Sequence, residues 1–314
     1  ICFLFSCDLL NVPMMNFSTP VELPKGLPPI THAQRLLLMG SCFAENIGRQ
    51  LKENSFHCDV NPFGILYNPF SVLEALQEIL SGKQYTASDL FFFRDCWHSP
   101  MHHGAFSAVS VEEALQQIND RLRQAHDRMS HTDWLLLTWG TTFVYQQRET
   151  GRIVSNCHKQ PEKLFTRRML TVDEIVDEYT RFLKELRNQN STLKVLFTVS
   201  PIRHIRDGMH ANQLSKATLL LAIEQLQSIF PTTVFYFPSY EIMLDELRDY
   251  LSERFSAVFF SDETKKIMDD CDSIRNALAH RPFHPDSEEH KRFLGQIVLK
   301  IERLNRKYPY LEFE

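Results

Sequence analysis

Glycine is scarce in this sequence, with 10 residues in 314. The chain contains neither a G-x-G-x-x-G stretch nor a Walker loop, which removes the main support for dinucleotide-binding and P-loop folds. The seven cysteines are odd in number and scattered, and no two of them form a C-x-x-C pair. This pattern supports neither a zinc knuckle nor a disulfide framework. We therefore expect reduced thiols, no metal and no cofactor.

Long apolar runs and an excess of positive charge are also missing. The net charge is -5, which gives no overall attraction to nucleic acid or anionic membranes. The apolar start, residues 1–7, is far below the roughly 20 residues of a membrane span. We expect no nucleic-acid partner, no membrane span and a cytoplasmic location. An exported or lipid-anchored form stays open, because residues 4–7 loosely resemble a lipoprotein cleavage box. We expect residues 1–16 to be an extension, artefactual or a signal remnant.

The residues that are present predict a folded α/β protein. Hydrophobic residues make up 43% and charged residues 23%, an ordinary globular composition. Four short apolar runs are typical of buried strands. They cover residues 35–39, 134–138, 194–199 and 233–237. Helical patterns separate them, which predicts βαβ units and a central parallel sheet.

The same patterns predict the organisation of the chain. Capping signals at Ser110 and Thr171 open two of the long helices. Residues 143–147 and 152–154 are typical of a hairpin. We expect one sheet domain over residues 17–260 and a C-terminal helical appendage over residues 261–314, packed on the same domain.

The first predicted strand leads into the strongest local signal, Ser41 and Cys42 after Gly40. Chemistry gathers at the carboxyl ends of strands in an open parallel sheet. A helix that begins here would lower the pKa of the thiol and offer N–H groups to an oxyanion. The pattern fits equally well a turn of small residues with Ser41 as the helix N-cap.

Residues 40–44, Gly-Ser-Cys-Phe-Ala, match the motif of the bacterial GSCFA family, which belongs to the SGNH/GDSL hydrolase superfamily. The chain also resembles this family at residues 61–69, 139–141, 156–159, 200–208 and 212–217. The resemblance implies a three-layer α/β/α sandwich, flavodoxin-like, with a central parallel sheet. It also implies hydrolysis or transfer of an acyl group from an ester.

The resemblance leaves the nucleophile open between two residues. Aligning Gly40 with the glycine of the superfamily's Gly-Asp-Ser places Cys42 over the serine. Chemical precedent in the superfamily favours Ser41. Because a thiolate needs a less strongly activating base than a serine hydroxyl, we slightly favour Cys42.

The resemblance also suggests groups that stabilise the oxyanion. Gly64 suits the first oxyanion loop, although it could simply belong to a turn. Gly140, Thr141 and Thr142 follow the second long strand at the expected place. The superfamily's asparagine is missing there, and Thr142 stands in its register.

Further polar residues follow the hairpin and the third long strand. Asn156 or His158 could supply the hydrogen bond that the missing asparagine leaves out. Arg203, His204 and Asp207 form a polar cluster at the correct edge of the sheet. Arg203 could hold an anionic substrate group through two hydrogen bonds, or pair with the aspartate to fix the loop.

The general base is the main departure from the superfamily. Its Asp-x-x-His should follow the last strand, yet residues 241–270 contain no histidine. Either the protein lost a loop after Tyr250 or the sequence skips it, and we favour the second. Asp207 with His210 forms a substitute Asp-x-x-His. Asp95 with His98 forms another, beside further histidines that fit no standard zinc motif.

Two functions from different classes follow. The first is an SGNH-like hydrolase or acyltransferase that acts on an O-acyl ester, such as an acetyl ester of a small molecule or glycan, through an acyl-enzyme. The second is a binding protein on the same scaffold without its base histidine, so the sequence leaves it uncertain whether the protein is an enzyme.

Overall fold

The computed structural model describes residues 21–203 and 205–246. The chain divides into two compact units, and Leu23–Tyr240 belong to one of them. The fold given below is that of the described part of this unit. The predicted N-terminal extension, the C-terminal appendage and the loop after Tyr250 lie outside the described residues.

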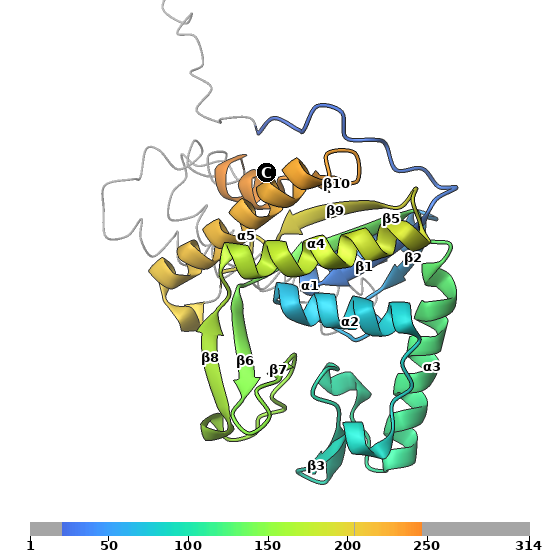
Figure 1. Ribbon diagram of the computed structural model, residues 1–314, viewed down its shortest axis with the longest axis vertical. Helices are drawn as coiled ribbons and strands as arrows, with labels where there is room; N and C mark the ends of the chain where they lie inside the picture. Colours follow the sequence, from blue (N-terminus) through green and yellow to red (C-terminus); the bar gives the residue numbers. More distant parts are fainter. Residues whose placement is uncertain (1–20, 204, 247–314) are drawn as a thin grey trace, which may run out of the picture. The chain divides into compact units, whose positions relative to one another are not determined.

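The centre of the unit is a parallel sheet with the strand order β10-β9-β5-β1-β2 (Figure 1). Its strands are β1 (Arg35–Gly40), β2 (His57–Val60), β5 (Trp134–Trp139), β9 (Lys194–Val199) and β10 (Val234–Tyr236). This order is the flavodoxin-like arrangement, in which the direction of winding reverses beside the first strand. The predicted α/β fold with a central parallel sheet is therefore confirmed. The edge strand β2 was not predicted.

Helices connect these strands, and side-chain caps fix where most of the helices start. They are α1 (Cys42–Glu53), α2 (Pro69–Ser81), α3 (Val111–Met129), α4 (Val172–Gln189) and α5 (Met209–Ile229), and a short helix α6 (Ser239–Glu241) follows β10. A π-helical turn, Ile242–Glu246, belongs to the other unit. Ser110 and Thr171 accept the N–H groups of the residues three positions later. Both are the predicted caps, and each satisfies an N–H that would otherwise lack a partner.

The sheet is covered on both faces, which explains why its central strands are apolar throughout. On one face, Leu36, Leu38 and Trp134 form a buried cluster against Ile47 and Leu51 of α1. On the other face, helices α4 and α2 are tied to the sheet through one tyrosine. The Tyr179 hydroxyl of α4 accepts the indole N–H of Trp139 at 3.2 Å. The same hydroxyl donates to the carbonyl of Pro69 in α2 at 2.8 Å.

Two antiparallel additions interrupt the parallel pattern. A three-stranded sheet, ordered β7-β6-β8, follows β5 at its carboxyl end (Figure 1). Its strands are β6 (Phe143–Gln147), β7 (Ile153–Val154) and β8 (Phe165–Met169). The β6–β7 hairpin is the predicted one, and β8 was not predicted. A shorter ribbon pairs β3 (Phe91–Phe93) with β4 (Cys96–His98).

Gly40 ends β1 in a conformation that only glycine adopts easily. Its φ is +137°, and a Cβ atom there would lie 2.1 Å from the carbonyl oxygen of Thr138 on β5. The two strands therefore approach at this point more closely than any side chain would permit.

We expect Gly40→Ala to lower the free energy of unfolding by about 2–5 kcal/mol, because it adds both backbone strain and overpacking. Urea denaturation followed by circular dichroism measures this loss. Gly104→Ala is the matched control, since a Cβ atom there meets nothing within 4 Å. Equal losses in the two variants would contradict the close approach at Gly40.

Candidate active site

The turn after β1 presents Ser41 and Cys42 at the carboxyl edge of the sheet. Asn61 holds the turn, because its Oδ1 accepts the N–H of Gly40 at 3.0 Å. The carbonyl of Gly40 accepts the N–H of Leu66 at 2.9 Å. Because β1 and β5 are neighbours where the winding reverses, the turn lies where ligands bind in such sheets.

Ser41 is the N-cap of α1. Its side chain is buried, with only 1% of the residue exposed. Its Oγ accepts the N–H of Phe43 at 3.2 Å, and its own N–H donates to the carbonyl of Thr138. The hydroxyl thus already serves the start of the helix, as the simpler interpretation of the sequence expected.

Cys42 is the first residue of α1, and its side chain is half-buried. Burial raises the pKa of the thiol above its usual value of 9.0. The N–H groups of Cys42 and Phe43 lower this pKa, and the negative charge of Glu45 raises it further. The N–H groups at the helix start do lower this pKa, but the loss of solvent outweighs them, so the net shift is opposite to the predicted one. The thiol is protonated at neutral pH.

Two pockets reach this turn, one at each of the two side chains. The Cys42 pocket has a volume of about 530 Å³ and contains Gly64 and His103. The Ser41 pocket has a volume of about 520 Å³. Tyr67 lines the Ser41 pocket, and its pKa is raised first by burial and then by the nearby Cys42. The thiol therefore lies close to both pockets.

The strands of the β7-β6-β8 sheet form an aromatic wall of the Ser41 pocket. Phe143 and Tyr145 of β6 and Arg167 of β8 all line it. The guanidinium of Arg167 lies over the ring of Phe143, 3.8 Å from its centroid. It also forms an ion pair with Asp207, whose side chain is only 4% exposed. The carboxylate thus fastens the loop after β9 to this sheet.

A buried lysine joins the ends of the two central strands β5 and β9. Lys216 of α5 is 1% exposed, and its Nζ donates to the carbonyls of Gly140 and Ser200, each at 2.6 Å. Burial lowers the pKa of this ammonium to about 7. Next to it, Ser215 accepts the N–H of Thr142 at 2.8 Å. Sequence reasoning missed both residues, although they lie in the family-like stretch 212–217.

The backbone groups expected to bind an oxyanion are already engaged. The N–H of Gly64 donates to the carbonyl of Asn61 at 2.8 Å. The N–H groups of Gly140 and Thr141 both donate to the carbonyl of Tyr67, at 2.7 and 3.0 Å. Gly64 and Thr141 nevertheless line the two pockets, Gly64 beside Cys42 and Thr141 beside Ser41.

Three other predicted residues do not reach these pockets, which corrects the sequence interpretation. Thr142 is fully buried, and its hydroxyl donates to Ser215 at 3.1 Å. The side chain of Asn156 accepts the N–H of His158 at 2.8 Å. The ring of His158 forms a hydrogen bond with the carbonyl of Ser99 at 2.8 Å, and the residue lines neither pocket.

The substitute pair Asp207 and His210 does not form. Asp207 is committed to Arg167, and His210 is exposed in the first turn of α5. Within the described part of the chain, no hydrogen bond joins these two side chains. Arg203 lines the Ser41 pocket. His204 lies outside the described residues.

His102, next to the β3–β4 ribbon, is built into the interior of the protein. His102 is 1% exposed, stacks on Phe63 with ring centroids 4.3 Å apart, and shares a hydrogen bond of 2.8 Å with Ser99. Burial lowers the pKa of His102 to about 3. No cluster of three potential metal ligands occurs in residues 21–203 and 205–246.

We expect the protein to lose stability in mild acid because of His102. The unfolded chain binds a proton at this histidine below pH 6.5, whereas the folded protein excludes the proton until about pH 3. Falling pH therefore favours unfolding, with a slope of about 1.4 kcal/mol per pH unit from this group. Urea midpoints between pH 4 and pH 7 measure the slope. His102→Gln should flatten it, and exposed His131→Gln should not. Equal slopes in all three proteins would contradict the assignment.

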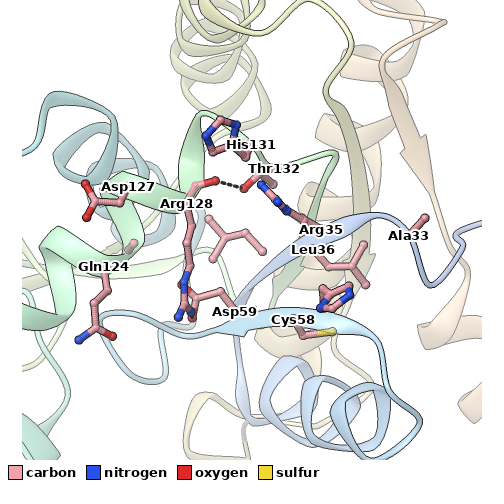
Figure 2. A pocket seen from close by; sticks show the side chains of 13 residues that line it. Ala33, Arg35, Leu36, Cys58, Asp59, Gln124, Asp127, Arg128, His131 and Thr132 are labelled. Atoms are coloured by element: carbon pink, nitrogen blue, oxygen red, sulfur yellow. Dashed lines mark hydrogen bonds and ion pairs between the residues drawn. The ribbon is translucent and has the colours of Figure 1, made fainter.

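A separate pocket of about 640 Å³ lies at the opposite, amino ends of β1 and β2 (Figure 2). Figure 2 shows the side chain of Arg128 extending from α3 toward Asp59 on β2. The Nη1 atom of Arg128 lies 3.6 Å from the Oδ1 atom of Asp59. Arg121 also pairs with Asp59, at 2.5 Å. Two guanidinium groups thus already satisfy this carboxylate, and the pocket is remote from the nucleophiles.

Two family models match the sequence. The model of the GSCFA family matches residues 35–277, and that of the GSCFA domain protein, C-terminal domain, matches residues 271–314. Among curated proteins, none matches the sequence. A solved structure of an acetyl xylan esterase from the rumen bacterium Butyrivibrio proteoclasticus is similar, with a TM-score of 0.33 and 12% identity. The alignment covers 73% of this chain and 66% of that one.

In the described part of the chain, every helix is too short or too polar to cross a bilayer.

Proposed function

The chain belongs to the GSCFA family, and from this premise we propose that it is a hydrolase or acyltransferase that takes an acyl group from an O-acyl ester through a thioester on Cys42. One observation carries the proposal. A half-buried thiol stands at the first position of α1, at the carboxyl edge of a flavodoxin-like sheet, with two N–H groups of the helix start acting on its sulfur.

The reaction would run in two steps. The sulfur of Cys42 attacks the ester carbonyl, a thioester forms, and the alcohol leaves with a proton. Water or an acceptor hydroxyl then attacks the thioester and releases the acyl group. The positive end of the α1 helix dipole would stabilise the negative charge that develops in both steps.

A base is needed because burial keeps the thiol protonated. The histidine that the SGNH resemblance implies would follow Tyr250, outside the described residues. In the Cys42 pocket the histidine that the structure describes is His103, an exposed residue whose Nδ1 accepts the N–H of Ala105 at 3.3 Å. Ser41 supports the nucleophile by capping its helix.

Trapping the acyl-enzyme tests this proposal. We expect the full chain to hydrolyse p-nitrophenyl acetate, and mass spectrometry of the acid-quenched reaction to find acetyl on the peptide that contains Cys42. Neutral hydroxylamine should remove this acetyl group, since it cleaves thioesters readily and oxygen esters slowly. A hydroxylamine-resistant acetyl group on Ser41 would reverse the assignment of the nucleophile. No turnover of a broad panel of acyl esters would favour the binding protein instead.

A further inference from the structure

The Ser41 pocket concentrates positive charge in a chain whose net charge is -5. Three arginines line it: Arg167, Arg203 and Arg206. Arg167 pairs with Asp207, and Arg206 pairs with Glu162. Arg203 makes no ion pair or hydrogen bond with any other residue in the part of the chain that the structure describes. Among the described residues, one positive charge in the pocket therefore has no partner of opposite charge.

The surroundings of Arg203 suit a flat, charged ligand. The residue follows Ser200 and Pro201 at the carboxyl end of β9 and is half-buried. The rings of Phe143 and Tyr145 provide an apolar wall, stiffened by the Arg167 guanidinium that lies over Phe143. A free guanidinium matches a carboxylate through two parallel hydrogen bonds.

We propose that Arg203 binds a carboxylate of the substrate, so that the ester cleaved at Cys42 is an acidic one. A single unpaired guanidinium balances a single negative charge, which favours a carboxylate over a phosphate dianion. The inference rests on the proposed function, because that function identifies the ester bond that is cleaved. The charge of the substrate is inferred from the Ser41 pocket.

The sheet determines roughly how far Cys42 lies from Arg203. Cys42 follows β1 and Arg203 follows β9, and β5 lies between these strands. Two strand spacings separate the strand ends by about 10 Å. The carboxylate should therefore lie several bonds away from the scissile carbonyl, on the acyl side or the alcohol side.

Matched pairs of charged and neutral esters test the proposal. Mono-4-nitrophenyl suberate carries the carboxylate on the acyl side, and 4-acetoxycinnamate carries it on the alcohol side. The methyl ester of each is its neutral counterpart, and release of the phenol gives kcat/KM. We expect the charged member of one pair to be preferred by at least about tenfold, as a charge-assisted contact requires. Arg203→Gln should bring this ratio close to one.

Arg152→Gln is the control, since Arg152 lies outside the pocket and pairs with Glu74 on the surface. It should keep the preference for the charged ester.

A ratio near one in the unaltered protein for both pairs, or an unchanged ratio in Arg203→Gln, would overturn the inference while leaving the proposed function intact. If no ester is cleaved, the proposed function fails, and calorimetry with suberate and with 4-hydroxycinnamate decides the inference. Binding that Arg203→Gln abolishes supports it, and absent or unchanged binding overturns it.

Discussion

Cys42→Ala is expected to lower kcat/KM for p-nitrophenyl acetate by about 1,000-fold or more, the scale on which loss of a catalytic nucleophile acts. The thiol is the accessible one of the two adjacent nucleophilic side chains, and the helix start acts directly on its sulfur. Steady-state kinetics with the purified full chain measures the loss. The unfolding midpoint should stay close to that of the unaltered protein.

Ser41→Ala provides the contrast, because it removes the helix cap and not the proposed nucleophile. We expect it to cost about 1 kcal/mol of stability, as loss of an N-cap does. Its activity should fall far less than that of Cys42→Ala. The opposite order of the two activities would show that the serine attacks the ester.

Lys216→Met is expected to have a large effect on stability. Methionine nearly matches the volume of the lysine stem but leaves the carbonyls of Gly140 and Ser200 without their buried donor. Removing one donor from two buried acceptors should cost about 3 kcal/mol. For a domain of this size that lowers the melting temperature by about 6–12 °C. Differential scanning calorimetry measures the shift.

The control for Lys216→Met is Lys184→Met, a lysine exposed on α4. It should leave the melting temperature almost unchanged. Because Lys216 holds the ends of β5 and β9, its variant should also lose activity at temperatures where it remains folded. A Lys216→Met protein as stable and as active as the control would show that the two carbonyls do not depend on this ammonium.

Much of the fold could be predicted because its signals are local. Strands β1, β5 and β9 are buried on both faces and are therefore continuous apolar runs. Ser110 and Thr171 mark helix starts through hydrogen bonds within a single turn. Among the strands that were not predicted, β2 and β8 have half-exposed or charged residues, so their sequences show no apolar run.

The site was predicted less well because its polar contacts join distant segments. Lys216 lies in a helical sequence pattern, where a lysine normally faces solvent, and only the packing of α5 on the strand ends makes it a buried donor. Arg167 could not be assigned to the pocket without β8. Thr142 was expected to face a substrate, but a hydrogen bond to Ser215 on α5 keeps its hydroxyl inside.

The β7-β6-β8 sheet has one more consequence, for how relatives of this protein can diverge. The proposed nucleophile belongs to the parallel sheet and its first helix, while an entire aromatic wall of the neighbouring pocket belongs to an insertion between β5 and α4. Changes in that insertion alter the shape and polarity offered to a ligand without disturbing the turn at Gly40. Selectivity and bond cleavage can therefore evolve on separate parts of the chain, and exchanging this insertion between relatives is a direct route to retargeting them.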